Sequence, residues 1–166
     1  MSALKKNIKL LITLFIILTF SLNLNSVYAA SGVGDNEKDE TILYKSGKKL
    51  VLKAKKLEKK DKIEKAQKLY LKALVKFEKA YAKDKKNADL LNYFGYALRK
   101  TGDFEKAEIR YLKGLELDAG HLGINEYLGE LYVQTGRIEL AKERLSVLKG
   151  CNCEEYDELK DLIEKN

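Results

Sequence analysis

The amino-acid sequence repeats with a period of 34 residues. When the sequence is shifted by 34 positions, Gly95 aligns with Gly129 and Gly102 aligns with Gly136. Other small, polar and aromatic residues fall into the same register: Tyr93 with Tyr127, Thr101 with Thr135, Ala107 with Ala141, and Arg110 with Arg144. Within each copy, apolar residues recur every three or four positions, which is the period of an amphipathic helix. A Thr-Gly pair interrupts this pattern, so each copy predicts two helices joined by a turn.

A less regular copy precedes these two. Ala66 and Tyr70 fit the template of Ala107 and Tyr111, but Ala66 lies 41 positions before Ala107, which is the repeat of 34 plus seven. Seven residues are close to two helical turns, so the second helix of this copy can lengthen without rotating its buried face. We therefore predict three repeats and a final helix that covers the last apolar face. Their expected ranges are about 47–87, 88–121 and 122–153 for the repeats and 154–165 for the capping helix.

This pattern resembles the tetratricopeptide repeat (TPR) family, whose unit is a 34-residue helix–turn–helix. The matching residues are Leu91, Phe94, Gly95, Leu98, Gly102, Phe104, Ala107, Tyr111 and Gly114 in one copy, and Leu128, Gly129, Tyr132, Gly136, Ile138, Ala141, Leu145 and Leu148 in the next. The sequence departs from the family at Ala119, where a proline is usual, and at Leu91 and Asn125, where a large aromatic is usual. The resemblance implies an all-α, TPR-type α-solenoid over residues 41–166.

The small residues have a physical role in this pattern. Gly95 and Gly129 lack a side chain, so the two helices of one unit can approach closely there, with Ala107 and Ala141 opposite them. Gly102 and Gly136 are expected to end the first helices, because glycine adopts the left-handed conformation without steric cost.

The first 29 residues have the pattern of a secretory signal peptide. Three lysines precede the apolar run Leu10–Phe20, and Val27 and Ala29 place small or slender side chains before a cut after Ala29, with Ala30 as the next choice. The alternative is an uncleaved membrane anchor, but the apolar run is about half of the roughly 20 residues that a spanning helix needs. Residues 30–40 are small, polar and charged, which predicts a flexible lead.

The signal peptide changes the charge balance. It contains three lysines and no acid, so its removal lowers the formal net charge from +7 to 7 − 3 = +4. We expect an exported protein, most simply periplasmic, that resembles small periplasmic TPR proteins of proteobacteria. Nucleic acid is not an expected partner, and contact with a membrane is expected only through an uncleaved signal segment.

Few residues in the sequence suggest chemistry. Cys151 and Cys153 leave three alternatives open: a strained local disulfide, disulfides to another chain or free thiols, and capture of a soft metal. His121 is alone in the loop between the second and third repeats and is expected to be an exposed polar residue. Phosphate loops, nucleophile elbows and metal-ligand clusters are absent from the sequence. We therefore expect no catalysis by this chain alone, no cofactor and no metal.

The remaining candidate site is a groove. The family resemblance implies that the first helix of each repeat lines a concave wall. The positions that would face it include Asn92, Tyr96, Arg99, Lys100, Glu126 and Glu130. Asn92, Arg99 and Lys100 would bind the backbone or a carboxylate of an extended peptide, and Tyr96 would give an apolar platform. The sequence thus predicts a module or scaffold that binds a peptide segment or a partner helix. The alternative is a thiol-redox or soft-metal protein that uses Cys151 and Cys153.

Overall fold

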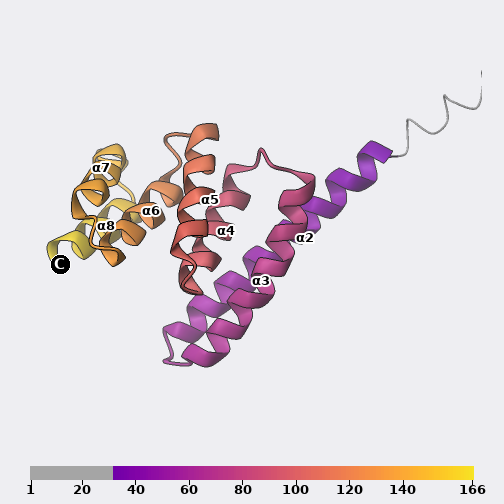
Figure 1. Cartoon of the computed structure of the whole chain (residues 1–166), viewed down its shortest axis with the longest axis horizontal. Helices are drawn as coiled ribbons and strands as arrows, with labels where there is room; N and C mark the ends of the chain where they lie inside the picture. Colours follow the sequence, from indigo (N-terminus) through magenta and orange to yellow (C-terminus); the bar gives the residue numbers. More distant parts are fainter. Residues whose placement is uncertain (1–31) are drawn as a thin grey trace, which may run out of the picture. The chain divides into compact units, whose positions relative to one another are not determined.

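The computed structural model describes residues 32–166, with side chains for residues 39–166. The signal peptide predicted over residues 1–29 lies outside the described residues. A division at Asp39 separates the N-terminal part of the chain from the packed helical unit Glu40–Asn166, and each is a unit of its own. The described residues form seven α-helices and no strand (Figure 1): α2 Gly32–Glu58, α3 Ile63–Lys83, α4 Ala88–Lys100, α5 Phe104–Leu117, α6 Leu122–Gln134, α7 Ile138–Leu148 and α8 Glu154–Glu164.

The helices of the packed unit form successive pairs. Helices α4 and α5 lie within the range expected for the second repeat, α6 and α7 lie within that of the third, and α8 coincides with the expected capping helix. Neighbouring pairs stack, with α3 against α4, α5 against α6, and α8 against both α6 and α7. Helix α3 has 21 residues whereas α5 has 14. This difference equals the seven residues by which the spacing from Ala66 to Ala107 exceeds the repeat of 34. The prediction of an all-α fold built from helix pairs is confirmed.

The flexible lead predicted over residues 30–40 is wrong for most of that segment. Helix α2 begins at Gly32, so residues 32–40 are helical. The segment contains no proline, so each of its residues can take part in the backbone hydrogen bonds that extend the helix. Among residues 32–166, no helix combines the length and the apolar character that a membrane span requires.

The helix ends follow from local side-chain chemistry. Asn87 and Asp103 begin α4 and α5, and their side chains accept hydrogen bonds from the third amide beyond them, at 2.9 Å from Leu90 and 3.3 Å from Lys106. The hydroxyl of Thr101 donates to the carbonyl of Ala97 at 3.0 Å where α4 ends. Gly102 and Gly136 have φ of +89° and +73°, the left-handed conformation expected for the residues that end the first helices.

Close approach at glycine differs between the repeats. A Cβ on Gly95 would lie 2.6 Å from the ring of Tyr111 in α5, so the two helices of the second repeat meet there as predicted. A Cβ on Gly129 would instead lie 2.5 Å from Leu159 of α8. The nearest side chain at Gly129 thus belongs to the capping helix, while α6 and α7 also pack against each other.

The first hairpin contains one more contact of this kind. A Cβ on Gly47 of α2 would lie 2.5 Å from the ring of Phe77 in α3. Gly47 lies seven residues before Ala54, and Phe77 lies seven residues after Tyr70. The pair therefore repeats the small-against-large contact two turns along the longer hairpin. Val51, Ala54, Tyr70 and Phe77 are all fully buried in the common core.

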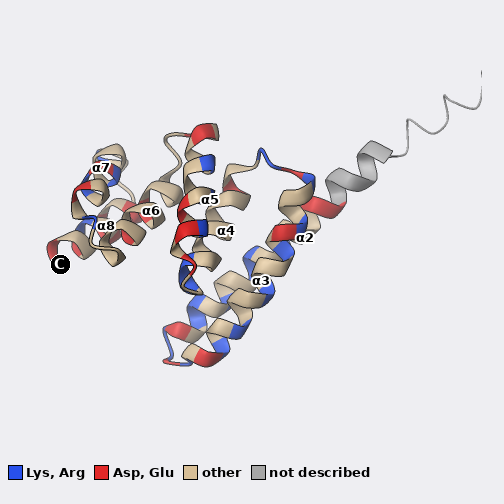
Figure 2. Cartoon of the chain, in the orientation of Figure 1, with Lys and Arg blue, Asp and Glu red and all other residues tan. Residues whose placement is uncertain are grey.

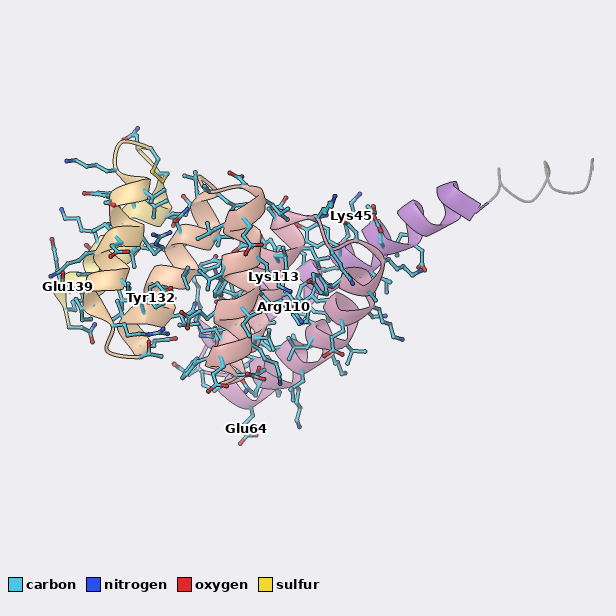
Figure 3. All side chains as sticks on the ribbon, turned by 45° about the horizontal axis from the view of Figure 1, so that its top comes forward. Lys45, Glu64, Arg110, Lys113, Tyr132 and Glu139 are labelled. Atoms are coloured by element: carbon cyan, nitrogen blue, oxygen red, sulfur yellow. A yellow bond between two sulfur atoms is a disulfide. The ribbon has the colours of Figure 1, made fainter. Side chains whose placement is uncertain are left out.

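A cation of α5 stacks on aromatic rings of α3 and α4. The guanidinium of Arg110 lies 4.4 Å from the centre of the Tyr81 ring and 4.7 Å from that of Phe94. Lys113, one turn further along α5, donates a hydrogen bond of 3.4 Å to the hydroxyl of Tyr81. Figure 3 labels Arg110 and Lys113 on α5 beside α3. These long side chains stabilise the stacking of the first two repeats through their apolar stems and their charge.

Candidate functional site: an acidic groove along the first helices

Two adjoining cavities follow the first helices of the repeats and the capping helix. One, of about 410 Å³, is lined by Asp89, Asn92, Tyr93, Asp118, Gly120, His121, Leu122, Gly123, Glu126, Tyr127 and Glu155. The other, of about 230 Å³, is lined by Lys55, Lys59, Glu126, Tyr127, Glu154, Glu155 and Glu158. Because they share Glu126, Tyr127 and Glu155, we treat them as one site and call it the acidic groove. A further hollow at residues 61–65 is lined by one turn and brings no distant residues together.

The charge of the acidic groove contrasts with that of the chain. Its lining contains six acidic residues and two lysines, whereas the whole chain has a formal net charge of +7. The basic residues concentrate elsewhere, and Figure 2 shows repeated blue bands along α2 and α3. On α3 these include Lys65, Lys68, Lys72, Lys76 and Lys79. A concave surface of one sign concentrates its field on a ligand of the other sign.

Glu126 is the most buried acid of the groove. Its side chain is 3% exposed, and the carboxylates of Glu126, Glu130 and Glu158 have oxygens that lie within 4.8 Å of one another. Burial, a hydrogen bond with Glu158 and repulsion from Glu130 raise the pKa of Glu126 to about 9, and nearby Lys55 opposes this only weakly. At neutral pH the buried carboxyl therefore holds a proton and shares it with Glu158.

The neighbouring Glu130 already has a cation. The guanidinium of Arg99 in α4 lies 2.6 Å from a carboxylate oxygen of Glu130, and Arg99 is 4% exposed. The same guanidinium lies 5.2 Å from the ring centre of Tyr96 and 5.8 Å from that of Tyr127. The pair joins the second repeat to the third and leaves Glu126 without a cationic partner of this strength.

Lys55 enters the groove from α2. Its ammonium donates a hydrogen bond of 3.1 Å to the hydroxyl of Tyr127 and lies 5.2 Å from the ring centre of Tyr96. Burial is the main cause that raises the pKa of Tyr96 to about 12, so this phenol stays protonated at neutral pH. The first helices of all three repeats thus contact one another around these two tyrosines.

Solved structures with the same arrangement of helices are TPR proteins. The chain superposes with a TM-score of 0.53 on a tetratricopeptide repeat protein from Parabacteroides merdae, at 17% identity over 73% of this chain, and it spans 60% of that protein. The second TPR domain of human RPAP3 in complex with the HSP70 peptide SGPTIEEVD gives a TM-score of 0.51 at 21% identity, over 76% of this chain and 99% of that one. The Arabidopsis OM64 TPR domain gives 0.50 at 15%, over 74% and 98%.

The tetratricopeptide repeat family profile matches residues 76–109, which include α4 and its junctions with α3 and α5. These residues thus match a tetratricopeptide repeat, and the chain has the fold of TPR proteins. No curated protein matches it in sequence. Its fold is the all-α, TPR-type solenoid that the sequence predicts, and the structural likenesses, all below 25% identity, establish the fold alone.

The predicted groove residues lie partly in other surroundings than the sequence led us to expect. Asn92 and Glu126 line the acidic groove as expected. Tyr96 and Arg99 are 5% and 4% exposed, so they lie inside the wall and are not a free platform and a free cation. Lys100 lies 2.9 Å from Glu58 of α2. Stacking of the repeats brings acids of neighbouring helices onto both cations, which the sequence of one repeat does not reveal. Contact of these residues with a partner stays a prediction.

Several residues of the groove were not predicted from the sequence. Glu154, Glu155 and Glu158 of α8 line it, although the sequence suggested only a capping role for this helix. Lys55 was also not predicted. Its position in the groove depends on the register of the irregular first repeat, which the sequence did not define. The acidic character of α8 was the available signal, since its first turn contains Glu154, Glu155 and Asp157.

His121 is not a freely exposed loop residue. It begins α6, where its Nδ1 accepts a hydrogen bond of 3.2 Å from the amide of Ile124. Its Nε2 lies 3.5 Å from a carboxylate oxygen of Asp89, and both residues line the groove. The loop histidine thus caps a helix and joins the second repeat to the third at the edge of the site.

The two cysteines lie between α7 and α8. Cys151 and Cys153 are joined by a disulfide, with Cα atoms 5.2 Å apart, which corresponds to the first of the three alternatives. Asn152 between them has φ of +51°. Neither cysteine lines the acidic groove. The residues that line these cavities therefore add no further group to a thiol or metal site at the two cysteines.

Proposed function

We propose that this protein is an exported interaction module or scaffold that holds a peptide segment or a partner helix in the acidic groove. The observation that carries the proposal is the groove itself, where side chains from α2, α4, α6 and α8 line two connected cavities. A surface assembled from four helices suits a ligand that runs across the repeats. The proposal includes no catalytic role.

Structures of the same fold support the use of the groove, without identifying its ligand. The RPAP3 domain is in complex with a peptide that ends in acidic residues, SGPTIEEVD. In the present chain Arg99 is paired with Glu130, and the groove is lined mainly by acids. A peptide of that charge would be repelled, so we propose a peptide or helix of different composition.

Site-specific photo-crosslinking tests the groove as the binding surface. A photoreactive benzoylphenylalanine at Glu154, an exposed residue that lines the groove, is expected to crosslink a partner in the envelope of cells that produce the protein. The matched control places the same residue at Glu105 of α5, which is exposed and outside both cavities. Adducts at Glu154 and none at Glu105 support the proposal. Equal adducts at both positions, or none at Glu154, contradict it.

Export is tested separately. We propose that residues 1–29 act as a signal peptide and that the mature protein is periplasmic, on the basis of the basic, apolar and small-residue order of the segment. Intact-mass measurement of the protein from a periplasmic fraction is expected to give a chain that begins at Ala30. A full-length mass in the membrane fraction would favour the uncleaved anchor.

A further inference from the structure

The lining of the acidic groove contains a buried carboxyl without a cation and a buried amide oxygen without a donor. Glu126 is 3% exposed, and no ion pair with a cation involves it among the described residues. Arg99 is bound to Glu130, and the ammonium of Lys55, the cation that acts on Glu126, donates to the hydroxyl of Tyr127. The ionised form of the Glu126 carboxyl would therefore lack the cation that buried charges normally have.

A second buried acceptor lies on the same wall and is not an acid. Asn92 of α4 is 5% exposed and lines the groove, and its Oδ1 has no hydrogen-bond partner. Its position corresponds to that of Glu126, since 126 − 92 gives the repeat of 34 residues. Unpaired buried acceptors are rare because each one costs free energy. Two adjacent repeats thus place a buried side-chain oxygen at the same position, and the one on Asn92 has no hydrogen-bond partner.

The groups around these acceptors define the charge that the groove suits. Asp89 and Asp118 line only the larger cavity, Glu154 and Glu158 line only the smaller one, and Glu155 lines both. Lys59 and Lys55 border only the smaller cavity. An ammonium or a guanidinium supplies several donors and a positive charge together, which complements this set of acceptors.

We infer that the acidic groove binds a basic peptide segment, with a lysine or arginine side chain placed against Glu126, Glu158 and Asn92. This inference rests on the proposed function, because it names the chemistry of the ligand that the groove would hold. A divalent cation fits less well, since Arg99 already occupies Glu130 and Lys55 lies close to Glu126. The cation of the peptide would ionise the buried carboxyl on binding, so complex formation at neutral pH releases part of a proton.

Fluorescence anisotropy with short homopolymers tests the charge of the ligand. Fluorescein-labelled hexalysine is expected to bind the purified protein saturably at physiological salt, whereas labelled hexaglutamate does not. The double substitution Glu126→Gln and Glu158→Gln should weaken hexalysine binding by about ten-fold or more. The control Glu105→Gln with Glu116→Gln makes the same two side-chain changes at exposed residues of α5, removes at least as much negative charge, and should change binding by less than about two-fold.

Calorimetry in two buffers of different ionisation enthalpy adds a readout specific to Glu126. The unmodified protein should release a fraction of a proton per hexalysine bound at pH 7, and Glu126→Gln should release none. The same affinity loss in both double variants, or binding of hexaglutamate in place of hexalysine, would overturn the inference. Saturable binding of Ca²⁺ that displaces hexalysine would also overturn it, because the carboxylates would then form a metal site.

These results separate the two proposals. If Glu154 still crosslinks a partner peptide while hexalysine fails to bind, the groove is the interaction site and the basic ligand is wrong. If the crosslink at Glu154 fails, the proposed function itself is wrong, whatever hexalysine does.

Discussion

Residues 34 positions apart in the second and third repeats occupy equivalent places with different contacts. Gly95 is covered by the ring of Tyr111 from its own hairpin, but Gly129 is covered by Leu159 from the capping helix. Tyr111 is fully buried, whereas Leu145, its equivalent in the third repeat, is only half-buried. The second repeat is therefore closed by its own two helices, and the third repeat needs α8 to complete its core.

The same comparison holds on the groove side. Asn92 and Glu126 are equivalent and both buried, but only Glu126 is ionisable. Tyr96 and Glu130 are also equivalent, and one stacks on Arg99 while the other forms its ion pair. The repeats thus keep the small residues that set the helix spacing and the tyrosine at Tyr93 and Tyr127, but they differ at Asn92 and Glu126. The polar groups along the groove therefore differ between repeats that share the same arrangement of helices.

The largest expected effect comes from truncating the large side chains that cover these glycines. Tyr111→Ala should lower the free energy of unfolding by about 4 kcal/mol, and Leu159→Ala by about 3 kcal/mol, because each leaves a cavity in a closed core. Leu145→Ala should cost only about 1 kcal/mol, since this residue is half-buried. Urea denaturation of the three variants measures the differences. A larger loss for Leu145→Ala than for Leu159→Ala would show that the third repeat closes on its own hairpin.

Adding a methyl group at the two glycines sharpens the comparison. Gly95→Ala should destabilise the protein by about 2 kcal/mol, because the new Cβ meets a buried ring that has little room to move. Gly129→Ala should cost about 1 kcal/mol, because it meets the end of a flexible leucine and gains helix propensity. Thermal unfolding by circular dichroism gives the order of the two variants. The reverse order would contradict the different closure of the two repeats.

The groove side of the comparison predicts a dependence on pH. The pKa of Glu126 is about 9 in the folded protein against an ordinary value of 4.5, so the folded state holds a proton that the unfolded chain loses between these values. Stability therefore falls as the pH rises from about 5 to 9. Glu126→Gln should leave stability nearly unchanged at pH 5 and raise it by about 2 kcal/mol at pH 8.5, because the amide never ionises.

The matched control for this prediction is Glu116→Gln, which removes an exposed carboxylate from α5. It should shift stability by less than about 0.5 kcal/mol at either pH. Urea midpoints measured at the two values give the comparison. A gain for Glu126→Gln that is equal at pH 5 and pH 8.5 would show that its carboxyl is not the group that titrates.

Most of the fold was predictable because it depends on local periodicity. Helix spacing follows from Gly95, Gly102 and their partners 34 positions later, and these residues act within one hairpin or one turn. The role of Leu159 was not predictable, because it depends on how the capping helix packs against Gly129 in the folded chain. The same reason explains the error over Arg99, since its pairing with Glu130 arises only when two repeats stack.

A further, modest effect is expected at the turn that leads from the third repeat into α8. The turn before α6 is held by the cap of His121, whereas Cys153 begins α8 without a side-chain cap, and a disulfide to Cys151 takes its place. A bridge between residues two apart closes a very short loop, so its removal by Cys151→Ser with Cys153→Ser should cost about 1.5 kcal/mol or less. Urea denaturation with and without reductant measures this loss, and intact mass reports whether the thiols are paired. The same double variant should bind hexalysine as the unmodified protein does, because neither cysteine lines the acidic groove. A loss of hexalysine binding together with unchanged stability would instead show that the cysteines take part in the site itself.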